Sequence, residues 1–200
     1  MFTSTSVPSR ASFSPVLSSP AADLAMRGGV AVAASLFVAL CAHIAIPVPF
    51  SPVPFTLQPF AVILVGLLLG PGLGAAAMIA YLCEGAAGLP VFTPQGLGGI
   101  AQLLGPTGGF LFAYPAAAAV AGWLFRMLPS RSRFVAGVCA GTAAIALIFA
   151  CGATWFGMET HLPAAAVMAG AVLPFLPSDL VKVCAAAGIA TALQNRSRKA

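Results

Sequence analysis

Charged side chains are scarce in this sequence of 200 residues, because Asp, Glu, Lys and Arg together make up 6% of it. Soluble globular domains carry about 25% charged residues, so the composition excludes an ordinary soluble fold. Apolar residues stand in their place, with 60% hydrophobic content and a mean hydropathy of +1.02. The composition therefore indicates an integral membrane protein that forms one helical bundle.

Side chains that perform chemistry are also few. The chain has two histidines and four acidic residues, and it contains no H-E-x-x-H, G-x-S-x-G or phosphate-loop motif. Its five cysteines lie singly in apolar runs without a C-x-x-C pair, which is typical of packing residues rather than disulfides or metal ligands. We expect no cofactor, no metal site and no enzyme activity.

The apolar runs and their Pro- and Gly-rich interruptions divide the chain into an all-α, polytopic fold. Six transmembrane helices are expected at residues 28–46, 55–69, 73–87, 110–125, 134–156 and 174–193, within one domain that covers residues 27–195. Residues 1–26 are predicted as a disordered cytoplasmic tail and residues 196–200 as a basic cytoplasmic tail.

Three outer loops without basic residues are predicted at residues 47–59, 88–109 and 157–173, and the first two are expected to be irregular. Residues 47–59 hold five prolines, which favours an extended, semi-rigid loop that covers an apolar pocket. Residues 88–109 are rich in glycine, with one short helical turn expected at residues 100–104. In the last helix, Pro177 suits the first turn and Ser178 is expected to cap it.

Positive charge predicts the orientation of the bundle. Eight of the nine Lys and Arg lie in the N-terminal segment, in the turn at residues 126–133 or in the C-terminal tail. Because cytoplasmic loops carry the positive excess, both termini and this turn are expected on the cytoplasmic side of a bacterial inner membrane. The charge forms no continuous basic surface, so no nucleic-acid partner is expected.

Polar side chains are expected to meet near the outer face. The predicted topology brings Gln58, Gln95, Tyr114, Asp179 and Lys182 to one depth, and this convergence indicates a binding site. Such a site suits a small, mostly apolar acid, whose carboxylate would meet the Lys182 ammonium and whose N–H groups would meet the Asp179 carboxylate. A buried ion pair that only fixes the last helix in its bundle is an equally good interpretation of these two charges.

Three further sets of residues are candidates. Thr93 lies in the same outer region, and Glu84 is an ionisable residue inside an apolar run. Ala31, Ser35 and Ala39 form a stripe of small residues on the first helix, which would let another helix approach closely. The sequence leaves open whether that helix belongs to a partner protein or to the same chain.

Five runs carry a resemblance to a known family: Pro52-Val-Pro-Phe-Thr-Leu-Gln58, Leu67-Leu-Leu-Gly-Pro71, Gly88-Leu-Pro-Val-Phe92, Leu104-Gly-Pro-Thr-Gly-Gly-Phe110 and Pro174-Phe-Leu-Pro-Ser-Asp-Leu-Val-Lys182. Together they resemble the BioY family, the biotin-specific substrate-binding subunits of energy-coupling factor (ECF) transporters. The resemblance implies six helices, an outward-facing biotin pocket, and association with a transmembrane coupling subunit and two ATPase subunits. It also implies that Asp179 and Lys182 contact biotin and that Gln58 belongs to the loop over the pocket.

This sequence departs from the family pattern at two places. Glu84 stands where an apolar or neutral residue is expected, and residues 92–97 contain no basic residue. The alternatives are an autonomous secondary transporter, in which Glu84 or Asp179 would carry the proton, and a membrane enzyme acting on a lipid or prenyl substrate. Self-association into a homo-oligomer stays open.

Overall fold

The computed structural model describes residues 20–49, 51–129 and 132–197, which are mostly helical. The elements in chain order are α1 (Pro20–His43), β1 (Ala45–Val48), β2 (Ser51–Thr56), α2 (Gln58–Leu69), α3 (Pro71–Ala86), α4 (Gly99–Leu104), α5 (Gly108–Met127), α6 (Arg133–Thr160), α7 (Ala164–Ala171) and α8 (Leu176–Ser197).

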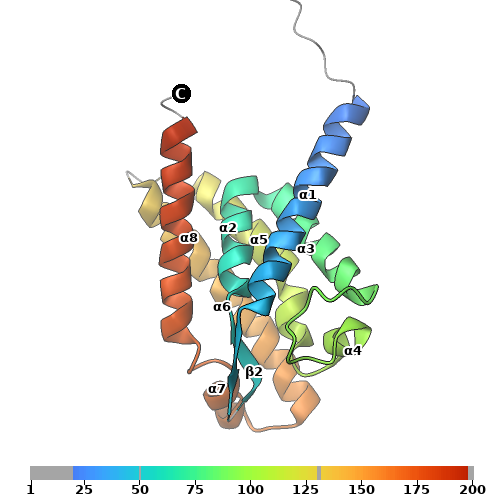
Figure 1. Cartoon of the computed structure of the whole chain (residues 1–200). Coiled ribbons are helices and arrows are strands. Elements are labelled where there is room, and N and C mark those ends of the chain that lie inside the picture. The colour runs from blue at the N-terminus through green and yellow to red at the C-terminus, as the bar shows by residue number, and fades with distance from the viewer. Residues whose placement is uncertain (1–19, 50, 130–131, 198–200) are drawn as a thin grey trace, which may run out of the picture.

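Six helices, namely α1, α2, α3, α5, α6 and α8, run alternately in opposite directions in one bundle (Figure 1). The two ends of the described chain and the turn between α5 and α6 lie at one end of the bundle, which we call the terminal end. The β1–β2 hairpin, α4 and α7 lie at the opposite end, the loop end. The three segments that the sequence predicted to be outer loops therefore share one end.

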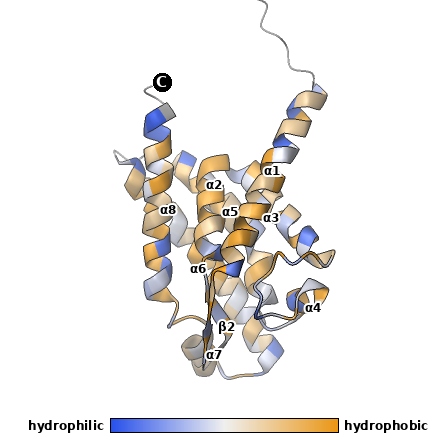
Figure 2. Cartoon of the chain, in the orientation of Figure 1, coloured by the Kyte–Doolittle hydropathy of each residue, from blue (hydrophilic) through white to orange (hydrophobic). Residues whose placement is uncertain are grey.

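Only four of these helices are long and apolar enough to cross a membrane by length and composition: α1, α5, α6 and α8. Helices α2 and α3 have 12 and 16 residues, about 18 and 24 Å at 1.5 Å per residue, against a hydrocarbon core of about 30 Å. Figure 2 shows apolar residues along the helices of the bundle. A mostly helical bundle with four candidate membrane spans is thus confirmed, whereas six complete spans are not.

The first helix begins earlier than predicted. Because α1 starts at Pro20, the prediction of a disordered tail is wrong for residues 20–26; residues 1–19 lie outside the described part of the chain. Proline suits the first turn of a helix, and the alanines and Leu24 that follow are strong helix formers, so the polar composition of the preceding residues gave the wrong boundary. The helix also ends at His43 rather than at Ile46.

The proline-rich run is extended, as predicted, but it also forms an antiparallel β-hairpin, so the strictly all-α prediction is wrong here. Ala45 pairs with Thr56 and Ile46 with Phe55, with an irregularity in the ladder before Val48. Each strand of a two-stranded hairpin has one free edge, where a proline without an N–H group costs no ladder hydrogen bond.

Small residues let the short helix α2 sit in the centre of the bundle. Its residues from Ala61 to Leu67 are buried, as expected of a helix that is apolar all round. A Cβ atom on Gly66 would collide with the backbone of Ala118 on α5, so only glycine permits this approach. At the end of α2, Gly70 has a φ of 82°, and the Arg126 guanidinium donates a hydrogen bond to the Leu69 carbonyl.

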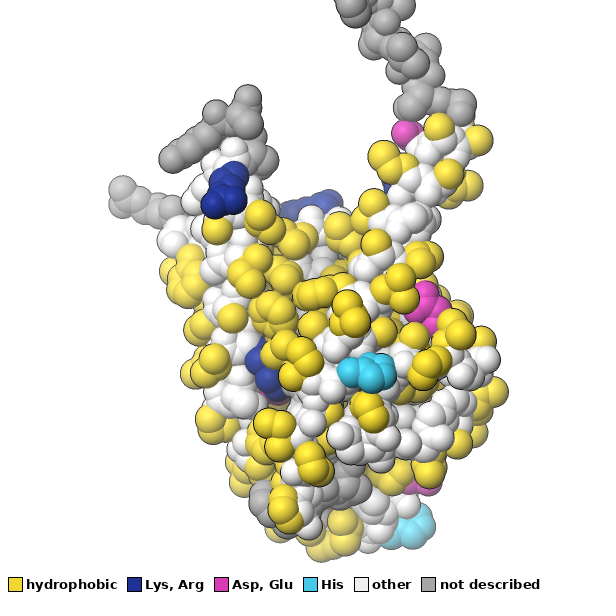
Figure 3. Space-filling model, viewed as in Figure 1, with side chains coloured by type: hydrophobic (Ala, Val, Ile, Leu, Met, Phe, Trp, Pro, Cys, Tyr) yellow, Lys and Arg dark blue, Asp and Glu magenta, His cyan; other side chains and the backbone are white. Residues whose placement is uncertain are grey.

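The remaining helices follow the predictions closely. The short turn at residues 100–104 is observed as α4, and Pro177 lies in the first turn of α8. Ser178 does not cap α8, because it lies inside the first turn and its hydroxyl donates back to the Phe175 carbonyl (2.9 Å). Basic side chains gather near the terminal end, above a broad apolar surface (Figure 3).

Candidate functional site

A cavity lies at the loop end and is walled by β2, α2, α5, α6, α7, α8 and the segment from Thr93 to Thr107. Its polar lining residues are Thr56, Gln58, Thr93, Gln102, Thr107, Tyr114, Asp179 and Lys182. Its apolar lining residues are Val53, Pro54, Pro59, Phe110, Leu111, Ile148, Phe149, Ala171 and Phe175. A mostly apolar lining with a few polar side chains suits a small organic ligand that carries a few polar groups.

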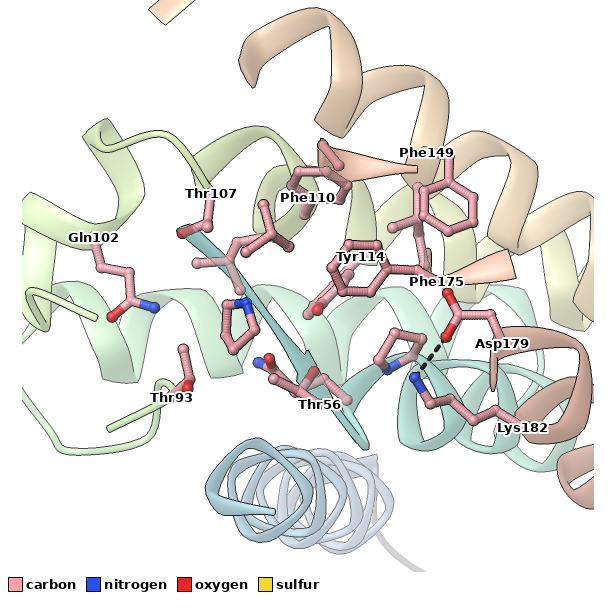
Figure 4. A pocket seen from close by; sticks show the side chains of 17 residues that line it. Thr56, Thr93, Gln102, Thr107, Phe110, Tyr114, Phe149, Phe175, Asp179 and Lys182 are labelled. Atoms are coloured by element: carbon pink, nitrogen blue, oxygen red, sulfur yellow. Dashed lines mark hydrogen bonds and ion pairs between the residues drawn. The ribbon is translucent and has the colours of Figure 1, made fainter. Parts of the chain in front are cut away.

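One side of the cavity carries an ion pair from the first turns of α8. The Lys182 ammonium donates to the Asp179 carboxylate across 2.5 Å, and their side chains are 12% and 6% exposed. The two residues are three positions apart, so they share a helix face that points into the cavity (Figure 4). Among the described lining residues they are the only charged ones, and together they are neutral.

The opposite side of the cavity is polar but uncharged. Figure 4 shows Thr93, Gln102 and Thr107 on this side, with Tyr114 and Phe175 between them and the ion pair. Gln102 on α4 accepts a hydrogen bond from the Gly98 N–H (3.2 Å), which leaves its amide nitrogen as the group that can meet a ligand.

The hairpin closes part of the cavity. Val53, Pro54 and Thr56 of β2 line it, and the Phe55 ring lies 4.5 Å from the Phe175 ring, measured between centroids. The proline-rich segment therefore covers an apolar pocket, as its composition predicted.

Five of the seven predicted binding residues meet in this cavity: Gln58, Thr93, Tyr114, Asp179 and Lys182. The structure does not bring Gln95 and Glu84 to it. Gln95 is exposed beside the cavity and accepts a hydrogen bond from the Thr93 hydroxyl (2.6 Å).

Glu84 lies instead between α3 and α1. Its Oε1 accepts a hydrogen bond from the Ser35 hydroxyl (2.7 Å), while its Oε2 is buried without a hydrogen-bond partner among the described residues. Other parts of the same chain bury the stripe of small residues: Ala31, Ser35 and Ala39 are 8%, 0% and 8% exposed. The stripe of small residues is thus occupied by internal packing in this structure, which agrees with the intramolecular alternative.

Sequence reasoning missed several lining residues. Two of them could have been found from the sequence. Gln102 is one of only four glutamines in an apolar chain, and Thr107 lies in the Leu-Gly-Pro-Thr-Gly-Gly run that resembles the family. Phe110 and Phe175 lie in two of the five family-like runs and so carried a similar signal. Phe149 carried none, because a phenylalanine in a membrane helix has the same sequence signature whether it packs against lipid, protein or ligand.

The fold and this cavity define a class of protein: a polytopic helical membrane protein with an amphipathic cavity at one end. The chain belongs to the BioY family, which residues 17–199 match. It is 39% identical over 164 residues to the probable biotin transporter BioY of Pyrococcus horikoshii and, over the same length, to the biotin transporter BioY of Thermotoga maritima. Each alignment covers 82% of this chain and 94% of the relative.

A solved structure resembles the whole bundle. It is described as the S-component for biotin from an ECF-type ABC transporter, and it is 25% identical to this chain. The two structures superpose with a TM-score of 0.77 over 86% of this chain and 93% of the other.

Proposed function

We propose that this chain binds biotin with high affinity and serves as the substrate-specific subunit of an ECF-type transporter that takes up biotin across the cytoplasmic membrane. The observation that carries the proposal is the cavity at the loop end, with an ion pair on one side and neutral amide and hydroxyl groups on the other. The family membership and the relatives described as biotin transporters support this ligand.

The ion pair limits how biotin can lie. Its ureido ring and its carboxylate are at opposite ends of the molecule, whereas Asp179 and Lys182 are bonded to each other and so meet the same end. A carboxylate beside this pair would face the Asp179 charge as well as the Lys182 charge. A cyclic urea carries N–H donors next to a carbonyl acceptor, which matches a carboxylate next to an ammonium.

We therefore assign the ureido ring to the Asp179–Lys182 side and revise the expectation that Lys182 meets the ligand carboxylate. The carboxylate then lies toward Gln102 and the exposed segment at residues 94–98, where water can still hydrate it. Burying a charge without compensation costs several kcal/mol, so the exposed side is the less costly place for it.

Six membrane-crossing segments with both termini in the cytoplasm agree with this function. The described basic residues Arg126, Arg133 and Arg196 lie at the terminal end, while the cavity lies at the loop end. The positive-inside rule then places the cavity mouth outside, although α2 and α3 are short for complete spans. Uptake would need a coupling membrane subunit and ATPase subunits, because this sequence has no nucleotide-binding motif.

Biotin uptake and binding test the proposal together. Purified chain in detergent is expected to bind biotin on its own, whereas cells that depend on external biotin should take it up only when coupling and ATPase subunits are also present. Proton-driven uptake by the chain alone would instead favour the secondary transporter, for which the candidate group is Glu84, whose Oε2 has no hydrogen-bond partner among the described residues. Absence of saturable biotin binding would refute both the ECF-type substrate-binding subunit and the secondary transporter of biotin.

Lys182→Met tests the assignment of the ureido ring. We expect it to weaken biotin and uncharged biotin amide by similar factors, because Lys182 then meets the ureido carbonyl that both ligands share. A loss confined to biotin would return the ligand carboxylate to Lys182.

A further inference from the structure

Gln58, at the start of α2, lines the cavity but commits one of its polar atoms to a buried hydrogen-bond chain. Its amide nitrogen donates to the Tyr81 hydroxyl on α3 (2.7 Å), and that hydroxyl donates to the Val91 carbonyl (3.0 Å). Gln58 is 3% exposed and Tyr81 is 0% exposed. These two hydrogen bonds therefore join α2, α3 and the segment after α3 in an environment closed to bulk water.

The donor and acceptor roles in these two hydrogen bonds are fixed by the groups that form them. A backbone carbonyl only accepts hydrogen bonds, so the single proton of the Tyr81 hydroxyl must point at Val91. The phenol oxygen can then only accept from Gln58, and the Gln58 atom in contact with it must be the amide nitrogen. A flipped amide would place two acceptors against each other, at a cost comparable to a lost buried hydrogen bond.

The oxygen of the Gln58 amide is consequently the free acceptor. Within the described part of the chain it has no hydrogen-bond partner, and it is not closed off as the second oxygen of Glu84 is. Because Gln58 lines the cavity, this oxygen is available to a ligand there.

Packing holds the Tyr81 ring in place. It meets the Phe92 ring edge-on, with centroids 5.3 Å apart, and stacks at 6.5 Å on the ring of Tyr114, which lines the cavity. Tyr81 itself does not line the cavity, so any effect on a ligand must pass through its neighbours.

We propose that Tyr81 is a positioning residue: its hydroxyl locks the Gln58 amide so that the amide oxygen faces the ligand and selects for an N–H donor. The proposal rests on the proposed function, in which the ligand N–H groups are those of the ureido ring of biotin. It gives Gln58 a defined role, as acceptor, and it makes selectivity for N–H depend on a residue outside the cavity.

The experiment compares biotin with its cyclic carbonate analogue, in which oxygen replaces each ureido N–H. The measured quantity is the ratio of the dissociation constants of analogue and biotin, determined by calorimetry on purified chain. Tyr81→Phe keeps the ring but frees the Gln58 amide to rotate, so we expect the ratio to fall about two- to ten-fold, the range of one neutral hydrogen bond. Gln58→Met should lower the ratio similarly, and adding Tyr81→Phe to Gln58→Met should change it no further.

A matched control separates positioning from packing. Phe92→Leu disturbs the same ring cluster without touching the hydroxyl, and it should lower the melting temperature while the ratio stays at the wild-type value. An unchanged ratio in Tyr81→Phe, or additive effects in the double variant, would overturn the proposal. Should Tyr81→Phe not fold, a wild-type ratio in Gln58→Met would overturn it and a lowered ratio would support it. If the wild type binds no biotin, the proposed function fails, and this inference fails with it.

Discussion

The Asp179–Lys182 pair gives the sharpest prediction about stability. The two groups are 2.5 Å apart with side chains 6% and 12% exposed, so either single change leaves the other charge buried and unpaired. Removing one partner of a buried pair costs about 3–5 kcal/mol, whereas replacing both partners is often neutral. We therefore expect Asp179→Asn and Lys182→Met each to be strongly destabilising, and the double variant to recover most of the loss.

Thermal unfolding of the purified protein in detergent measures this effect. At about 2–4 °C per kcal/mol for a chain of this size, each single variant should melt roughly 6–20 °C below wild type. Glu159→Gln, which removes an exposed carboxylate at the end of α6, is the matched control and should change the melting temperature little. Single variants as stable as wild type, or a double variant less stable than both singles, would show that Asp179 and Lys182 do not depend on each other as a buried pair.

Three further predictions concern packing, the α1–α3 contact and topology. Gly109→Ala should destabilise the bundle by about 1–3 kcal/mol in thermal unfolding, because its new Cβ atom would collide with Trp155 on α6; a wild-type melting temperature would show that the two helices separate freely. Ser35→Ala should cost about 1–3 kcal/mol, since it leaves the Glu84 carboxylate without its only hydrogen bond within the described residues, and a stability unchanged from wild type would mean that water replaces the hydroxyl. In a chain without native cysteines, a membrane-impermeant thiol reagent applied from outside should label a cysteine at Gln95 but not one at Ser132; the reverse pattern would invert the proposed orientation.

Much of the architecture was predictable because it is encoded in composition along the chain. Proline and glycine indicate the loops whatever the tertiary structure is. Because charged residues are scarce, Asp179 and Lys182 are conspicuous in the sequence. Once the helices alternate, the three charge-poor segments must share one end, and the side chains at that end must meet. The location of the cavity follows from these two facts.

The contacts that the sequence could not predict depend on partners far away in the chain. Glu84 looked like a binding residue because an acid in an apolar run needs a partner, but that partner is Ser35, 49 residues earlier. The hairpin depends on pairing between Ala45–Val48 and Ser51–Thr56, which a count of prolines does not reveal. The role of Tyr81 depends on a hydrogen-bond chain through three segments and has no local signature.

Equilibrium binding of radiolabelled biotin to purified chain, in wild type and in Ala171→Leu, tests whether biotin binds in the cavity at the loop end. Ala171 is fully buried in the wall of the cavity, so a leucine there would fill space that the ligand needs. We expect one saturable biotin site per chain in wild type and its loss in a folded Ala171→Leu protein. No saturable binding in wild type, or undiminished binding with the cavity filled, would contradict this expectation.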